Sequence, residues 1–107
     1  MRAYELMIIF DAGLDESAVQ SHINRIEAQA SQSGATLHKT DKWGVRRFAY
    51  EMKHRWEGFY VVLELISPNS LDEIDRTLRL ADEVIRHKFM RLPVTEAHRR
   101  GLAAATA

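Results

Sequence analysis

The residues best suited to bind another molecule lie between Lys39 and Tyr60, where arginine and lysine side chains interleave with aromatic ones. The rings in this stretch are Trp43, Phe48, Tyr50 and Trp56. Cations neutralise phosphates, and guanidinium planes or exposed rings stack on unpaired bases, so the composition favours RNA binding. A solvated hairpin without a binding role could carry the same charges. The side chains of Phe48, Tyr50 and Met52 share one strand face, which predicts that these three lie in the core.

The net charge of the 107-residue chain is zero, so any electrostatic case for nucleic acid depends on how the charges are distributed. Residues 38–56 hold six Lys/Arg against two Asp/Glu, and residues 86–107 hold five against one, a net charge of plus four for each. Residues 1–37 and 57–85 hold two against five and two against seven, which gives minus three and minus five. Positive charge is therefore confined to two blocks.

Catalytic and cofactor chemistry finds little support in the residues. The histidines form no H-x-H, H-x-x-x-H or H-E-x-x-H spacing, and each has a structural explanation; they are His22, His38, His54, His87 and His98. Cysteine is absent, and no glycine-rich phosphate loop occurs. The acidic pairs Asp15/Glu16 and Asp72/Glu73 fit first helical turns, where they complement the helix dipole. We expect no enzyme, metal, cofactor or small-molecule substrate.

The first half of the chain predicts a strand, a helix and a second strand. Ala3 to Phe10 is rich in β-branched and aromatic residues, and a turn follows it. Apolar residues then recur at spacings of four, three and four, which predicts a helix from Asp15 to a stop at Gly34, roughly to Ser33. Strand character returns from Thr36 to Asp41 and from Val45 to Met52.

The second half repeats this order. Lys53 to Gly58 is predicted as a turn, and Phe59 to Ile66 as a central strand because it is almost continuously apolar. Ser70 and Glu73 fit a capping box that opens a short helix. Val84 to Leu92 is predicted as the last strand.

This order predicts an α+β, ferredoxin-like split βαβ fold (βαββαβ), a four-stranded antiparallel sheet with two helices on one face. We expect a domain over residues 1–92 and a flexible C-terminal tail over residues 93–107. Both faces of the two central strands are apolar, so the face without helices should carry hydrophobic surface. A partner that covers it is one explanation, and a tolerated apolar patch is the other.

Several separated motifs, in order, resemble the family of the bacterial small-subunit ribosomal protein S-six. The main one is Trp43-Gly-Val-Arg-Arg-Phe-Ala-Tyr50, with Gly58-Phe-Tyr60 eight residues on. The opening Met1-Arg-Ala-Tyr-Glu5, the Leu14-Asp-Glu16 helix start and the strand Val84 to Arg91 are similar to the family at corresponding places. One departure is Glu51, where the family often has proline.

The resemblance implies a structural role in the platform of the small ribosomal subunit, with binding to small-subunit (16S) ribosomal RNA and to ribosomal protein S-eighteen. It implies a ribosomal location. The apolar run that ends at Phe10 is too short for a membrane span and lacks a signal-peptide cleavage pattern, so we expect a cytoplasmic protein without membrane contact. By position, the residues expected to contact RNA phosphates are Arg2, Arg46, Arg47, Lys53, Arg86, Lys88 and Arg91. We expect the N-terminus, the second strand and the last strand to present this charge near one sheet edge.

A competing interpretation is a stand-alone ferredoxin-like module that senses a ligand or dimerises through its sheet. It predicts a self-associating protein. A small enzyme on the same fold would need a convergent polar cluster that the sequence does not show.

Overall fold

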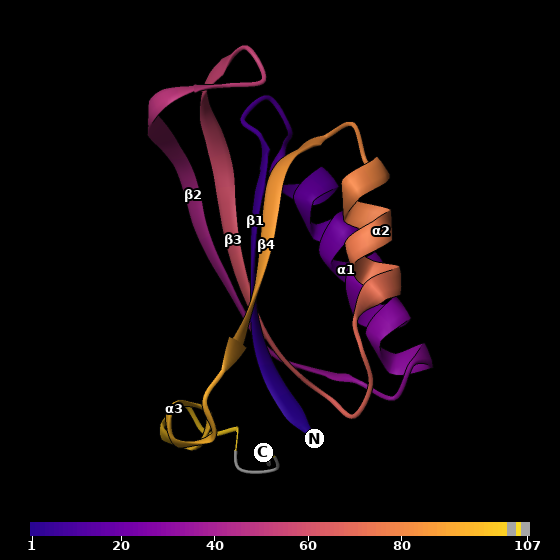
Figure 1. The fold of residues 1–107 in the computed structure, drawn as a ribbon. Coiled ribbons are helices and arrows are strands. Elements are labelled where there is room, and N and C mark those ends of the chain that lie inside the picture. Colours follow the sequence, from indigo (N-terminus) through magenta and orange to yellow (C-terminus); the bar gives the residue numbers. More distant parts are fainter. Residues whose placement is uncertain (103–104, 106–107) are drawn as a thin grey trace.

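The computed structural model describes residues 1–102 and Ala105, which form one sheet backed by two helices (Figure 1). The strands are β1 (Arg2–Asp11), β2 (Thr36–Met52), β3 (Arg55–Ser67) and β4 (Val84–Leu92). The helices are α1 (Glu16–Gln32), α2 (Asp72–Leu80) and α3 (Val94–Arg99). All pairs are antiparallel, in the order β2-β3-β1-β4, so β1 and β3 are central. The ferredoxin-like prediction is confirmed.

The main core lies between the sheet and helices α1 and α2. Alternate residues of β1 point into it, namely Leu6, Ile8 and Phe10, and β3 contributes Val61, Leu63 and Leu65. The helices add apolar residues at helical spacing: Val19, Ile23, Ile26, Ala30, Ile74 and Leu78. Because strand side chains alternate between faces, the remaining residues of β1 and β3 point to the opposite face. We call this second surface the open face.

The helix boundaries agree only partly with the sequence patterns. The Asp15 carboxylate accepts a hydrogen bond from the Ala18 N–H at 2.8 Å and caps α1. Gly34 adopts φ +83° just after the helix, as expected at its end. The capping box predicted for α2 is wrong, because its N-cap is Leu71 and the Ser70 hydroxyl donates instead to Asp72 Oδ2 at 3.0 Å.

The hairpin between β2 and β3 turns more tightly than the sequence predicts. Only Lys53 and His54 form the turn, with φ of 46° and 63°, and β3 begins at Arg55 rather than after Gly58. Two consecutive left-handed residues make the two-residue reversal that suits twisted strands. No glycine occupies either turn position, which explains why the pattern suggests a longer loop.

Near this hairpin, β2 folds over the open face. Between Arg47 and Met52 the strand register shifts, and Phe48 packs against Ile9 and Ile85 with 8% of its surface exposed. The predicted core position is confirmed for Phe48, and Met52 is half-buried against the same cluster. It is wrong for Tyr50, which is 58% exposed, because the shift breaks the regular alternation of side chains.

The chain after Leu92 forms an element that the sequence analysis does not anticipate. Helix α3 and the residues after it bury Ala97, Leu102 and Ala105 against Ala3 and Leu92. The open face carries apolar residues as expected, together with charged ones such as Glu5 and Glu64. The C-terminal segment covers one end of this face and Phe48 covers the other. The flexibility of residues 93–107 stays a prediction. None of the described helices is long and apolar enough to cross a membrane.

Candidate nucleic-acid interface

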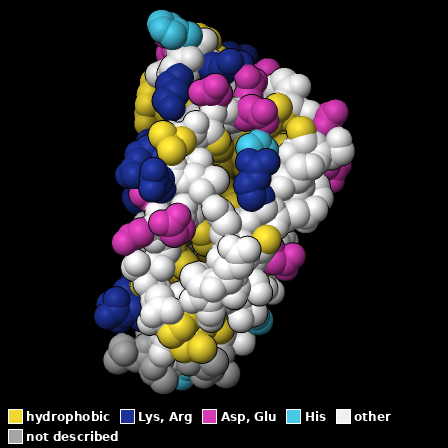
Figure 2. Space-filling model, turned by 90° about the vertical axis from the view of Figure 1, so that its right-hand side faces the viewer, with side chains coloured by type: hydrophobic (Ala, Val, Ile, Leu, Met, Phe, Trp, Pro, Cys, Tyr) yellow, Lys and Arg dark blue, Asp and Glu magenta, His cyan; other side chains and the backbone are white. Residues whose placement is uncertain are grey.

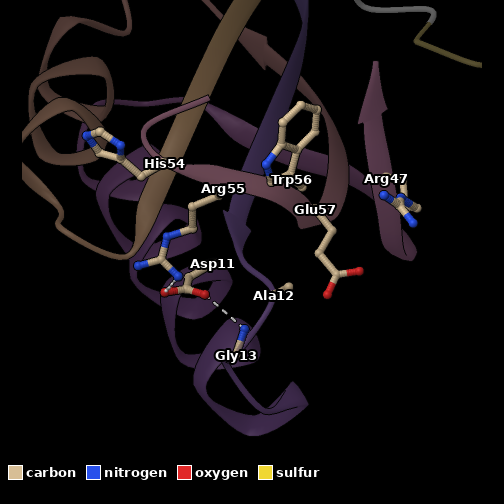
Figure 3. Close-up of a pocket in the computed structure, with 8 residues that line it drawn as sticks. All are labelled: Asp11, Ala12, Gly13, Arg47, His54, Arg55, Trp56 and Glu57. Atoms are coloured by element: carbon tan, nitrogen blue, oxygen red, sulfur yellow. Dashed lines mark hydrogen bonds and ion pairs between the residues drawn. The ribbon is translucent and has the colours of Figure 1, made fainter. Parts of the chain in front are cut away.

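The end of the sheet that carries the β2–β3 hairpin contains a cavity of about 620 Å³ (Figure 3). It forms where the turn after β1 meets the start of β3 and one residue of β2. Its lining residues are Asp11, Ala12, Gly13, Arg47, His54, Arg55, Trp56 and Glu57. The cavity therefore combines two guanidinium groups, a histidine and an indole, the kinds of side chain that contact phosphates and bases.

Only one of the two cavity arginines is held by a carboxylate. Arg55 Nη1 lies 2.7 Å from Asp11 Oδ2, and the other oxygen of Asp11 accepts the Gly13 N–H at 2.9 Å. Arg47 is exposed and makes no ion pair with any described residue, although Glu57 lies opposite it in the β2–β3 ladder. The Arg47 guanidinium is thus available to an external anion.

Two indole rings are exposed on this half of the molecule. Trp56, at the cavity, is 52% exposed, and Trp43 is 47% exposed and stacks on Tyr60 with centroids 6.1 Å apart. The rings of Trp43 and Tyr60 are nearly parallel, at 9°. A buried ring supports the core, whereas an exposed one has a face free for a base, so Trp56, which lies at the cavity with Arg47, is a better candidate for base stacking than Phe48.

A second group of cations lies along β1 and β4. Arg86 pairs with Ile9 and Lys88 with Met7, which places both on the open face, while Arg91 pairs with Tyr4. Arg2 and Arg91 together line a cavity of about 330 Å³ beside the start of α3.

The expectation that all these charges meet near one edge is wrong. In the order β2-β3-β1-β4, the second and last strands form opposite edges of the sheet. The structure thus places Arg46, Arg47 and Lys53 around the hairpin, and Arg86, Lys88 and Arg91 on β4 at the other edge. Arg2, on the neighbouring central strand β1, shares a cavity with Arg91. The predicted ferredoxin-like plan itself puts the first and third strands in the centre, so the second and last strands have to lie at opposite edges.

All seven predicted contacts share one property. None of them makes an ion pair within the part of the chain that the structure describes, and all seven are exposed. Figure 2 faces the helices and shows acidic and basic side chains interspersed on that side. The helix side therefore has mixed charge, and the two sheet edges are the better candidates for RNA.

Three features of the hairpin cavity were not predicted from the sequence. Neither Arg55 nor His54, at its exposed turn position, was expected to contact RNA, and the role of Trp56 was left open. A basic-aromatic run from Lys53 to Trp56 was the available signal. Across residues 1–102 and Ala105, no three His, Asp or Glu side chains gather closely enough to hold a metal ion.

The fold and these surfaces define a ferredoxin-like domain with exposed cations at both sheet edges. A family model described as Ribosomal protein S6 matches residues 3–91. The chain belongs to this family. It is 40% identical over 92 residues to small ribosomal subunit protein bS6 of Acidothermus cellulolyticus, covering 85% of this chain and 96% of the relative. The protein of the same name from Saccharopolyspora erythraea is 42% identical over 108 residues, covering 100% and 92%.

A solved structure gives the same answer for the fold. The crystal structure of 30S ribosomal protein S6 from Thermotoga maritima superposes with a TM-score of 0.81 at 27% sequence identity. The match covers 94% of this chain and 96% of that one. The arrangement of sheet and helices described above is therefore that of the family.

Proposed function

We propose that this protein is a structural constituent of the small ribosomal subunit in the cytoplasm, where it binds small-subunit ribosomal RNA together with ribosomal protein S-eighteen. Membership of the ribosomal protein S6 family over residues 3–91 carries the proposal. The names of the curated relatives, which are small ribosomal subunit proteins, support the ribosomal role.

The RNA contacts we propose form two groups. The hairpin group comprises Arg46, Arg47 and Lys53, next to the cavity with Trp56. The β4-edge group comprises Arg2, Arg86, Lys88 and Arg91. Because none of the seven is neutralised by a carboxylate in the described structure, each retains its charge for a phosphate. An RNA that uses both groups would contact the two edges of the sheet.

Binding to ribosomal RNA in the presence of S-eighteen tests the proposal. We expect affinity to fall steeply with salt, since each neutralised phosphate releases counterions and contributes about one unit to the slope of log K against log salt. Salt-independent or absent binding would refute the RNA role. Self-association without RNA binding would instead favour the ligand-sensing or dimerisation module.

A further inference from the structure

The open face is organised in rows of residues that lie side by side across the strands. The row at the α3 end joins Ile66, Ala3 and Leu92, and it packs against Ala97, Leu102 and Ala105. The next row joins Lys39, Glu64, Glu5 and Met90. Two carboxylates on the central strands therefore lie next to the row that the C-terminal segment packs against.

Glu5 and Glu64 are direct cross-strand partners on the two central strands. Like charges in this position repel one another, and Glu64 is only 7% exposed, so little water screens it. A carboxylate pair of this kind needs a cation. We call Glu5 and Glu64 the carboxylate pair.

Arg100 supplies this cation from the C-terminal segment. Its Nη1 lies 3.0 Å from Glu5 Oε1 and 3.2 Å from Glu64 Oε2, and its Nε donates to Glu96 Oε1 at 2.9 Å. Hydrogen bonds to Glu96, and then to Glu5, raise the pKa of the Arg100 guanidinium above its ordinary value. The guanidinium thus joins the end of α3 to the sheet.

A cavity of about 300 Å³ continues from the carboxylate pair along the open face. Beside Arg100 it is lined by the exposed Trp43 ring and by Val62, with Asp41 and Lys39 from β2. An aromatic face next to carboxylates suits an arginine side chain, which stacks on the ring and pairs with the acids. The three carboxylates of the lining outnumber its two cations, so the surface favours a basic protein segment over the phosphates of RNA.

Arg100 and the carboxylate pair that it contacts come from different parts of the chain. Glu5 and Glu64 lie within residues 3–91, which the family model covers, whereas α3 and Arg100 lie beyond it. The alignment with the Acidothermus protein spans 92 residues, which are 96% of that protein but only 85% of this chain. The Saccharopolyspora protein aligns over the whole chain. The segment that carries Arg100 thus lies outside the residues that the family model matches.

We propose that the carboxylate pair and the adjoining cavity are a binding site for an arginine of a protein partner, and that Arg100 occupies this site from within the chain. The C-terminal segment then competes with an arginine-bearing segment of the partner. The inference rests on the proposed function, because it takes ribosomal protein S-eighteen as the partner to be tested.

The first test measures the affinity of the full-length protein for S-eighteen before and after Arg100→Gln. Removing the internal competitor should tighten binding by roughly threefold to tenfold, the range of one charge-assisted contact. Hydrogen exchange should show faster exchange in α3. Arg99→Gln is the matched control, because Arg99 pairs with Glu96 but not with the carboxylate pair, and it should leave affinity unchanged. Equal or weaker binding by the Arg100 variant overturns the proposal.

A double variant tests the carboxylate pair itself. In the Arg100→Gln background, Glu5→Gln should reverse the gain in affinity for S-eighteen, because the partner's arginine loses one of the two carboxylates that bind it. Unchanged affinity of the double variant relative to Arg100→Gln overturns the site. Glu96→Gln, which loosens Arg100 without altering the receptor, should give a smaller gain and serves if the Arg100 variant folds poorly.

The outcomes separate the two proposals. If the wild-type protein binds neither S-eighteen nor ribosomal RNA, the proposed function fails and this inference fails with it. If the wild type binds both and Arg100→Gln changes nothing, only the inference fails. If Arg100→Gln makes the chain self-associate on size-exclusion chromatography instead, the site takes a second copy of this protein and the assignment to S-eighteen is overturned.

Discussion

Arg46 and Arg47 at the hairpin end of the sheet differ from Arg100 at the α3 end in whether the fold neutralises their charge. At the hairpin end, Arg46 and Arg47 are exposed and make no ion pair among the described residues. At the α3 end, Arg100 contacts three carboxylates and joins the C-terminal segment to the sheet. Charge alone therefore does not identify a binding residue. A cation whose charge is not neutralised within the fold can bind an external phosphate, and a neutralised one stabilises the fold.

The largest expected effect concerns the α3 end. Leu102 is fully buried in a small cluster with Ala97 and Ala105, so Leu102→Ala should lower the free energy of unfolding by about 2 to 3 kcal/mol. Urea unfolding measures the change. Leu80→Ala, at a position 69% exposed, should cost far less. Equal effects of the two variants would mean that the C-terminal segment adds nothing to the fold.

The second prediction concerns how the hairpin end is held. A Cβ at Gly58 would lie 2.5 Å from Ile9 Cγ2 and 2.9 Å from Phe48 Cζ, so Gly58→Ala must displace both side chains of this cluster. We expect a loss of about 1 to 3 kcal/mol in unfolding free energy. Gly13→Ala is the control, since its Cβ would meet nothing closer than 3.4 Å. A neutral Gly58 variant would show that Phe48 is not fixed over the open face.

Charge reversal tests whether the unpaired arginines of the hairpin end bind RNA and the paired arginines of the α3 end do not. Arg46→Glu with Arg47→Glu should weaken RNA binding at least about tenfold and lower the salt slope, while binding of S-eighteen is largely kept. Arg99→Glu is the matched reversal at the α3 end, where the arginine is already paired with Glu96. It should change RNA affinity much less. Equal loss of RNA and partner binding at Arg46 and Arg47 would contradict a division between these surfaces.

The smallest effect is a pH dependence of the α3 end. The hydrogen bond from Arg100 lowers the pKa of the Glu96 carboxyl below its ordinary 4.5. The Glu96 carboxylate therefore stabilises the packing of α3 fully at pH values above 4.5. This stabilisation is lost as the pH falls through the lowered pKa of Glu96. Hydrogen exchange in α3 should accelerate in this acidic range, and Glu96→Gln should reduce the dependence. Identical pH profiles for the variant and the wild type would exclude Glu96 as the cause.

Much of the fold follows from local patterns. The apolar spacing of Val19, Ile23 and Ile26 predicts α1, and the continuous apolar run from Phe59 to Ile66 predicts a central strand. These predictions succeed because a periodic apolar face has few ways to be buried. The pattern fails at Tyr50 and at the Lys53–His54 turn, where a register shift and two left-handed residues depend on contacts with other strands.

The candidate interface divides in a similar way. Sequence motifs alone are enough to identify the family and to select seven cations, since residue order within a motif is a local property. The tertiary structure decided that Trp56 lies at a cavity with Arg47, that Arg2 and Arg91 share a second cavity, and that Arg100 meets Glu5 and Glu64. Such facts depend on contacts between residues up to 95 positions apart, which no local pattern encodes.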